Sequence, residues 1–163
     1  MRTLLTVLLA LALVSMSACQ KKQRTDGDAE GSSAITDEAI AGDLADSDSG
    51  RAMGLETVHY AYDSAVLDSK GKTTLKNNAR ILKDKSSVSV QIEGHTDERG
   101  GIQYNIALGE RRANAARAFL IDQGVSANRV TIISYGKERP VDPGQDESAW
   151  AKNRRANFRV TEK

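Results

Sequence analysis

The sequence predicts an α+β two-layer sandwich, in which a mixed β-sheet carries helices on one face. Two observations indicate this fold: short stretches in which apolar and polar residues alternate, and two longer stretches in which apolar residues recur at helical spacing. Their order along the chain is β-α-β-α-β-β. Strands that alternate with helices imply parallel pairings made by crossovers, whereas no crossover helix separates the last two strands, so we expect a mixed sheet.

Alternation identifies the strands, each of which is expected to be buried on one face. The alternating residues are Val58, Tyr60 and Tyr62 in the first strand, Val88, Val90 and Ile92 in the second, Val130, Ile132 and Ser134 in the third, and Phe158 and Val160 in the last.

Helical spacing places the first helix at 70–85 and a longer one at 103–123. The predicted buried face of the first helix is Leu75, Ala79 and Leu82, and that of the second is Tyr104, Leu108, Ala115 and Phe119. Gly124 is placed to cap the second helix. A short helical turn is expected at 148–153.

The 163-residue length suits one domain with additional segments, and the charge is unevenly distributed. Residues 19–52 hold four basic and eight acidic side chains, whereas residues from 53 onward hold 18 basic and 14 acidic ones. A mildly basic domain attracts an anionic polymer. The bias is too small for nucleic-acid binding, and no basic stripe with interleaved aromatics supports that function.

The first 18 residues have the pattern of a secretory signal peptide. A positive start at Arg2 precedes an apolar run at 4–14 and a small-residue exit that ends at the single cysteine, Cys19. The run is too short to span a membrane. This exit resembles a bacterial lipobox, although Met16 stands where Leu is usual. The resemblance implies that Cys19 carries lipid, and Gln20 favours the outer membrane; an ordinary cleaved signal is the alternative.

Residues 19–52 are predicted to be a flexible linker after the lipidated cysteine, and residues 53–163 the folded domain. The linker has no aromatic residue and is rich in Asp, Ser, Gly and Ala, so it cannot bury enough apolar surface to offset its ordering entropy. A transient helix or docking segment at 35–44 is the alternative for part of it.

The candidate site follows the second strand. Asp97 lies in the loop after this strand, and Asn105, Leu108 and Arg112 share one face of the next helix. An acid beside a guanidinium suits a zwitterion, because Arg holds a carboxylate with two hydrogen bonds and Asp accepts from an ammonium. The free end of diaminopimelate in peptidoglycan has this pair of charges. An internal Asp97–Arg112 salt bridge that binds nothing is the alternative.

Several motifs resemble one known family. They are Gly94-His95-Thr96-Asp97-Glu98-Arg99-Gly100, Tyr104-Asn105 with Leu108-Gly109-Glu110-Arg111-Arg112-Ala113, Tyr62-Asp63-Ser64, Ser134-Tyr135-Gly136, and Asn153-Arg154-Arg155-Ala156. Over about residues 57–160 they resemble the OmpA-like C-terminal domain family, in particular its branch of peptidoglycan-associated lipoproteins in Gram-negative bacteria. Gly101 departs from this pattern, where Thr is frequent, as does Tyr62, where Phe is usual.

The resemblance implies how diaminopimelate is bound. It assigns the ligand-binding acid to Asp97 and the ligand-binding arginine to Arg112, with Asn105 and Leu108 between them. Asp63 and Ser64 match a loop that also lines the family's site, and Arg99 is a weaker candidate for contact with the peptide. The adjacent Arg154 and Arg155 resemble a feature near the rim of the site, although two such arginines at a strand start are more often a solvated edge.

The resemblance also implies a location and partners. The expected protein is anchored by lipid in the outer membrane, faces the periplasm, binds peptidoglycan non-covalently and joins the Tol system, including TolB, in cell division. A wall-binding lipoprotein of the same fold without Tol partners is the alternative.

An enzyme that modifies peptidoglycan is a remote third possibility. His59 and His95 are the only histidines and Cys19 lies in the leader region, so a metal site with three convergent ligands is not expected. No Ser lies in a nucleophile-elbow motif. We therefore expect a binding protein that uses no cofactor or metal.

Overall fold

The computed structural model describes residues 45–162, and in this part of the chain four strands form one mixed sheet. The strands are β1 (Val58–His59), β2 (Ser89–His95), β3 (Val130–Gly136) and β4 (Arg155–Glu162), and their order across the sheet is β1-β4-β2-β3. β2 and β3 are parallel, whereas β4 runs antiparallel to both β1 and β2. The predicted mixed sheet is confirmed, with the last strand inserted between the first and the second.

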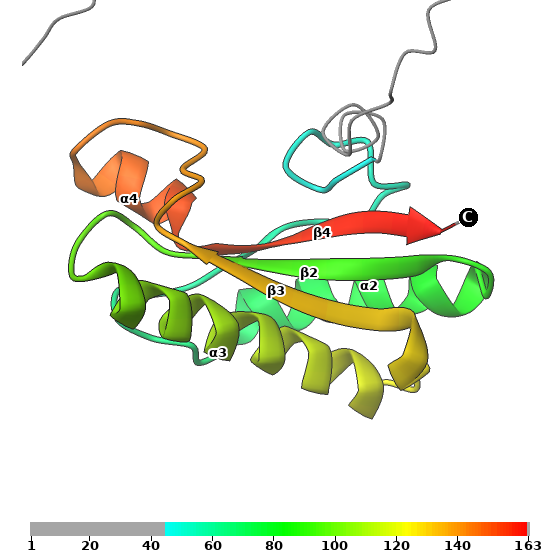
Figure 1. Cartoon of the computed structure of the whole chain (residues 1–163). Coiled ribbons are helices and arrows are strands. Elements are labelled where there is room, and N and C mark those ends of the chain that lie inside the picture. The colour runs from blue at the N-terminus through cyan, green and yellow to red at the C-terminus, as the bar shows by residue number, and fades with distance from the viewer. Residues whose placement is uncertain (1–44, 163) are drawn as a thin grey trace, which may run out of the picture. The chain divides into compact units, whose positions relative to one another are not determined.

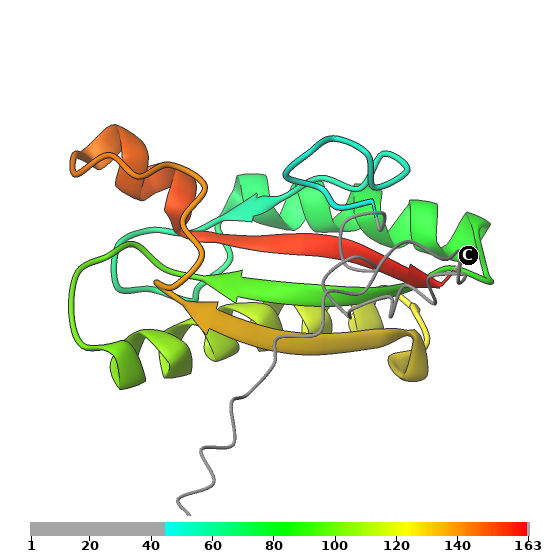
Figure 2. The same ribbon diagram turned by 45° about the horizontal axis from the view of Figure 1, so that its top comes forward.

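Two long helices cover one face of this sheet, as predicted (Figure 1). They are α2 (Ser69–Asp84) and α3 (Ile102–Asp122), and the buried cluster between them and the sheet includes Leu75, Ile92 and Phe158. Seen from the other face, the sheet lies in front of both helices (Figure 2). A short 3-10 helix, η1 (Ala127–Arg129), precedes β3, and α4 (Glu147–Asn153) precedes β4 where a helical turn was expected.

The buried face of α3 differs from the predicted one. Tyr104 is half-exposed, and the buried residues are Asn105, Leu108, Gly109, Arg112, Ala113, Ala116 and Leu120. Apolar spacing did not identify this face because two of its inward residues, Asn105 and Arg112, are polar and form hydrogen bonds with loop carbonyls. Most of the other inward residues are small.

Small residues let α3 approach the end of β2. A Cβ atom on Gly94 would lie 1.9 Å from the carbonyl oxygen of Gly109, and a Cβ on Gly109 would lie 2.4 Å from the Ser134 hydroxyl. Neither position therefore admits a side chain without movement of the backbone. This contact fixes the start of α3 beside the loop that follows β2.

The first strand and the domain boundary also differ from the prediction. β1 ends at His59, and beyond it Tyr62 is 60% exposed rather than buried. Residues 45–52 were expected in the linker, but residues 45–48 lie against β4: the Val160 N–H donates to the Ala45 carbonyl, and Arg155 pairs with Asp48. The signal peptide, Cys19 and the possible helix at 35–44 lie outside the described residues.

Candidate functional site

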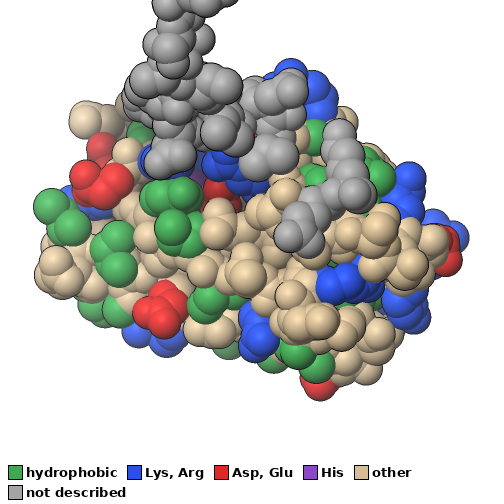
Figure 3. Space-filling view, turned by 45° about the vertical axis from the view of Figure 1, so that its right-hand side comes forward, with side chains coloured by type: hydrophobic (Ala, Val, Ile, Leu, Met, Phe, Trp, Pro, Cys, Tyr) green, Lys and Arg blue, Asp and Glu red, His purple; other side chains and the backbone are tan. Residues whose placement is uncertain are grey.

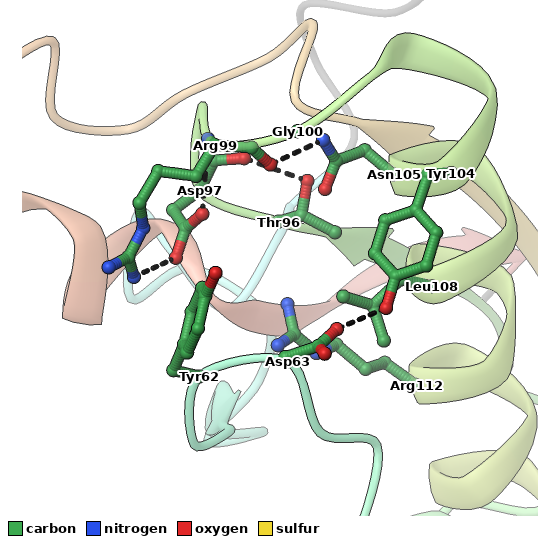
Figure 4. A pocket seen from close by; sticks show the side chains of 10 residues that line it. All are labelled: Tyr62, Asp63, Thr96, Asp97, Arg99, Gly100, Tyr104, Asn105, Leu108 and Arg112. Carbon is green, nitrogen blue, oxygen red and sulfur yellow. Dashed lines mark hydrogen bonds and ion pairs between the residues drawn. The ribbon is translucent and has the colours of Figure 1, made fainter.

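A pocket opens at the end of the sheet where β2 stops, between three segments (Figure 4). These are the loop after β1, the loop between β2 and α3, and the first turns of α3. The residues that line it are Tyr62, Asp63, Thr96, Asp97, Arg99, Gly100, Tyr104, Asn105, Leu108 and Arg112. Six of the seven predicted ligand-binding residues therefore meet in one pocket.

Asp97 is a buried carboxylate held by two arginines. Its side chain accepts from the backbone N–H of Arg99 at 3.2 Å, from the Arg99 guanidinium at 2.7 Å and from Arg154 Nη1 at 3.4 Å. Burial alone raises the pKa of Asp97, but the hydrogen bonds from Arg99 and Arg154 outweigh it and hold this pKa below its ordinary value of 3.8. Asp97 is therefore charged at neutral pH and can accept from an ammonium.

Arg112 is a fully buried guanidinium, 0% exposed, that binds three backbone carbonyls. Nε donates to Ser64 at 2.8 Å, Nη1 to His95 at 2.9 Å and Nη2 to Ala61 at 3.0 Å. The side chain thus ties α3 to the loop after β1 and to the end of β2. Tyr60 strengthens the same junction, since its hydroxyl donates to the Arg112 carbonyl at 2.8 Å.

The Arg112 charge has no close counter-ion. Among residues 45–162, no carboxylate oxygen lies within 4.0 Å of its nitrogens, and Asp97 pairs with Arg99 and Arg154 instead. The internal Asp97–Arg112 salt bridge, which was the alternative to a binding site, is therefore absent from the described residues. Burial lowers the pKa of Arg112 to about 10, so the group stays protonated at neutral pH.

Arg99 lies between two aromatic rings beside Asp97. Its guanidinium carbon is 3.9 Å from the centre of the Tyr62 ring and 4.1 Å from that of Trp150 on α4. Trp150 in turn donates its indole N–H to the Glu98 carboxylate at 3.3 Å. Cation–π contacts with both rings hold the arginine at the mouth of the pocket.

The loop between β2 and α3 is held by side chains on either side. Asn105 Nδ2 donates to the carbonyls of Arg99 at 2.9 Å and Gly101 at 3.2 Å. Lys137, just after β3, donates to the carbonyls of Glu98 at 3.1 Å and Gly100 at 2.8 Å. Asn105 therefore positions the loop that carries Asp97.

The remaining predicted residues lie at the wall and the rim. Leu108 is buried and forms an apolar wall. Asp63 has a positive φ of 50° and accepts a hydrogen bond from the Tyr104 hydroxyl at the exposed rim. Ser64 does not line the pocket; its carbonyl binds Arg112, and its hydroxyl accepts from the Val66 N–H.

Arg154 and Arg155 are not a solvated edge, because both are buried and paired. Arg154 contacts Asp97 and Glu147, whereas Arg155 Nε lies 2.6 Å from an Asp48 oxygen. Sequence reasoning missed Arg154 as a partner of Asp97. It also missed four residues that line the pocket: Tyr62, Thr96, Gly100 and Tyr104.

Other kinds of site find little support in the described part of the chain. Residues 45–162 contain no group of three His, Cys, Asp or Glu side chains placed to hold a metal ion. Within the same residues, no helix combines the length and apolar character needed to cross a membrane. The face shown in Figure 3 has basic, acidic and hydrophobic side chains interspersed, without one dominant charge.

Comparison with known proteins identifies the family. Residues 59–154 match the model of the OmpA family. A peptidoglycan-associated lipoprotein of Pseudomonas aeruginosa is 41% identical over 162 residues, covering 93% of each chain, and one of Legionella pneumophila is 39% identical, covering 93% of this chain and 91% of the relative. These names describe lipoproteins, not enzymes.

Solved structures agree with the sequence relatives. The crystal structure of the peptidoglycan-associated lipoprotein from Burkholderia pseudomallei is 39% identical and superposes with a TM-score of 0.63, covering 64% of this chain and 89% of that one. The C-terminal domain of Helicobacter pylori MotB, at 21% identity and a TM-score of 0.63, shares the fold. The chain therefore belongs to the OmpA family, among the peptidoglycan-associated lipoproteins.

Proposed function

We propose that this protein binds peptidoglycan non-covalently by gripping the free amino-acid end of diaminopimelate in the stem peptide. The observation that carries this proposal is that Arg112, a buried cation without a close counter-ion, and the ionised Asp97 line the same pocket without pairing with each other. A bound carboxylate supplies the charge that Arg112 lacks, and a bound ammonium adds a donor to Asp97. The names of the relatives support the same polymer as ligand.

The other pocket residues have supporting roles in this proposal. Leu108 packs against the methylene groups of the ligand, and Asn105 keeps the Asp97 loop in place. Arg99 and Asp63 contact the peptide at the mouth of the pocket. Ser64 acts through its carbonyl, which holds Arg112.

A sedimentation assay tests the proposal. Purified chain in detergent is mixed with isolated sacculi, and Asp97→Asn is compared with Asp122→Asn, an exposed control at the last residue of α3, at the other end of this helix from the pocket. We expect the wild type and the control to sediment with the sacculi and Asp97→Asn to remain largely soluble. Equal sedimentation of all three places the site elsewhere. Release of soluble muropeptides from the sacculi would instead reveal an enzyme.

The lipid anchor and the cellular role extend the proposal. Lipid on Cys19 places the protein in the outer membrane with its domain in the periplasm, so that wall binding ties this membrane to the cell wall. Metabolic labelling with a fatty-acid analogue tests the anchor, since Cys19→Ser should abolish labelling.

Participation in the Tol system, including a TolB partner, is supported by the likeness to peptidoglycan-associated lipoproteins. Co-purification from crosslinked cells tests it: recovery of a TolB-like protein supports a role in cell division. Recovery of peptidoglycan alone favours the plainer wall tether without Tol partners.

A further inference from the structure

The base of the pocket is built from hydrogen-bond donors. A guanidinium has five N–H donors and no acceptor. Arg112 gives three of them to the carbonyls of Ala61, Ser64 and His95, which leaves one N–H on each terminal nitrogen without a partner among residues 45–162. Figure 4 shows this end of Arg112 below Thr96 and beside Asp63, facing into the pocket. Donors on both terminal nitrogens of one guanidinium can bind the two oxygens of one carboxylate.

The charge of Arg112 also favours a carboxylate as the ligand. The three acceptors bound to Arg112 are neutral carbonyls, and the side chain is 0% exposed. A buried charge is unfavourable unless it is paired. A ligand carboxylate neutralises this charge, whereas a carboxamide is neutral and turns an NH₂ donor toward the remaining guanidinium donors.

The pocket has little freedom to adapt to such an amide. The Asn105 NH₂ group is already bound to two loop carbonyls, and the Thr96 hydroxyl donates to the Asp97 carbonyl at 3.0 Å. Asp63, an acceptor near Arg112, is held at the rim by Tyr104. These contacts would have to break before the pocket could present an acceptor at its base.

We infer that the site distinguishes the free acid of diaminopimelate from its carboxamide, so that amidation of this one carboxyl group releases the protein from the wall. The inference rests on the proposed function and adds a means of regulation. The modification involved is ATP-dependent amidation: ATP activates the carboxylate, one of its oxygens leaves on phosphate, and a glutamine amide supplies the NH₂ that replaces it. The ligand thereby loses one negative charge. The ammonium at the same end is unchanged, so the contact with Asp97 does not discriminate.

Calorimetric titration of the full chain in detergent tests this inference. The two ligands are stem tetrapeptides, L-Ala-γ-D-Glu-diaminopimelate-D-Ala, with the far carboxyl group of diaminopimelate either free or amidated. We expect the amidated peptide to bind more weakly by a factor of about 10 to 100, because it loses a charge-assisted pair of hydrogen bonds. Asp97→Asn should weaken both peptides by a similar factor and keep their ratio.

The possible outcomes separate the two proposals. If the free-acid peptide does not bind, the proposed function fails. If both peptides bind and their affinities differ by less than tenfold, the proposed function stands and the discrimination is overturned. If Asp97→Asn removes the difference between the peptides, the discriminating group is not Arg112, and the inference is likewise overturned.

Discussion

Replacing Arg112 by Ala is expected to destabilise the fold as well as the site. The change leaves the carbonyls of Ala61, Ser64 and His95 without their donor. The His95 carbonyl is buried, and leaving it unpaired costs about 1–3 kcal/mol. The carbonyls of Ala61 and Ser64 are only partly buried, and that of Ala61 also accepts from the Ser64 N–H at 3.4 Å, so losing these two bonds costs about 1–2 kcal/mol each. Removal of a buried charge offsets part of this by relieving its desolvation. We expect the free energy of unfolding to fall by about 4 kcal/mol, as when other buried polar networks are broken.

Urea titration followed by far-UV circular dichroism measures this loss. The matched control is Arg111→Ala, one residue earlier on α3 and exposed, which should change the unfolding free energy by less than about 0.5 kcal/mol. A loss below about 1 kcal/mol for Arg112→Ala would show that the three carbonyls do not depend on this side chain. Arg112 would then not be needed to hold these three segments together. For this reason Asp97→Asn, rather than Arg112→Ala, is the variant chosen for the sedimentation assay.

Three further predictions concern the same end of the sheet. Gly94→Ala should lower the melting temperature by many degrees, because the added Cβ would lie 1.9 Å from the Gly109 carbonyl oxygen. The control Gly101→Ala should not lower it, because its Cβ would meet nothing within 4 Å. Equal melting temperatures of the two variants would contradict the close packing at Gly94. The pKa of Asp97 in the folded protein lies below 3.8, so ionised Asp97 contributes its full share of stability at pH values above 3.8. This stabilisation is lost as the pH falls through the folded-state pKa. Acid unfolding curves of Asp97→Asn should therefore lack this pH-dependent loss of stability. Asn105→Asp should weaken sacculus binding more than Asn105→Ala, because a carboxylate there faces two carbonyl oxygens, and the reverse order in sedimentation would argue against the loop-holding role.

Periodicity predicted much of the fold because most elements bury one continuous apolar face. Leu75, Ala79 and Leu82 on α2 lie in the core as expected, and the strands after β1 contain the predicted residues except Val88, which lies just before β2. Apolar periodicity did not predict the buried face of α3, because Arg112 and Asn105 face inward there. Polar inward residues are satisfied by loops that are distant in sequence, and no local pattern records such partners.

The candidate site shows the same division. Asp97 and Arg112 are recognisable from their loop and helix positions, together with the motif around them. The pairing of Asp97 with Arg154 spans 57 residues and depends on the insertion of β4 between β1 and β2. Sequence spacing contains no information about that strand order, so Arg154 looked like an exposed arginine.

The contact of residues 45–48 with β4 determines how the domain carries mechanical load. Tension from the N-terminal side enters at Ala45, which is hydrogen-bonded to Val160, whereas the pocket lies near Arg154 at the start of β4. These two positions are six residues apart, about 20 Å along the strand. Under the proposed function, with the wall bound at this pocket and the lipid anchor on the N-terminal side, a pull runs along β4 and loads its hydrogen bonds in shear, all together instead of one at a time. The ion pair of Arg155 with Asp48 lies on the same path and adds resistance close to the pocket.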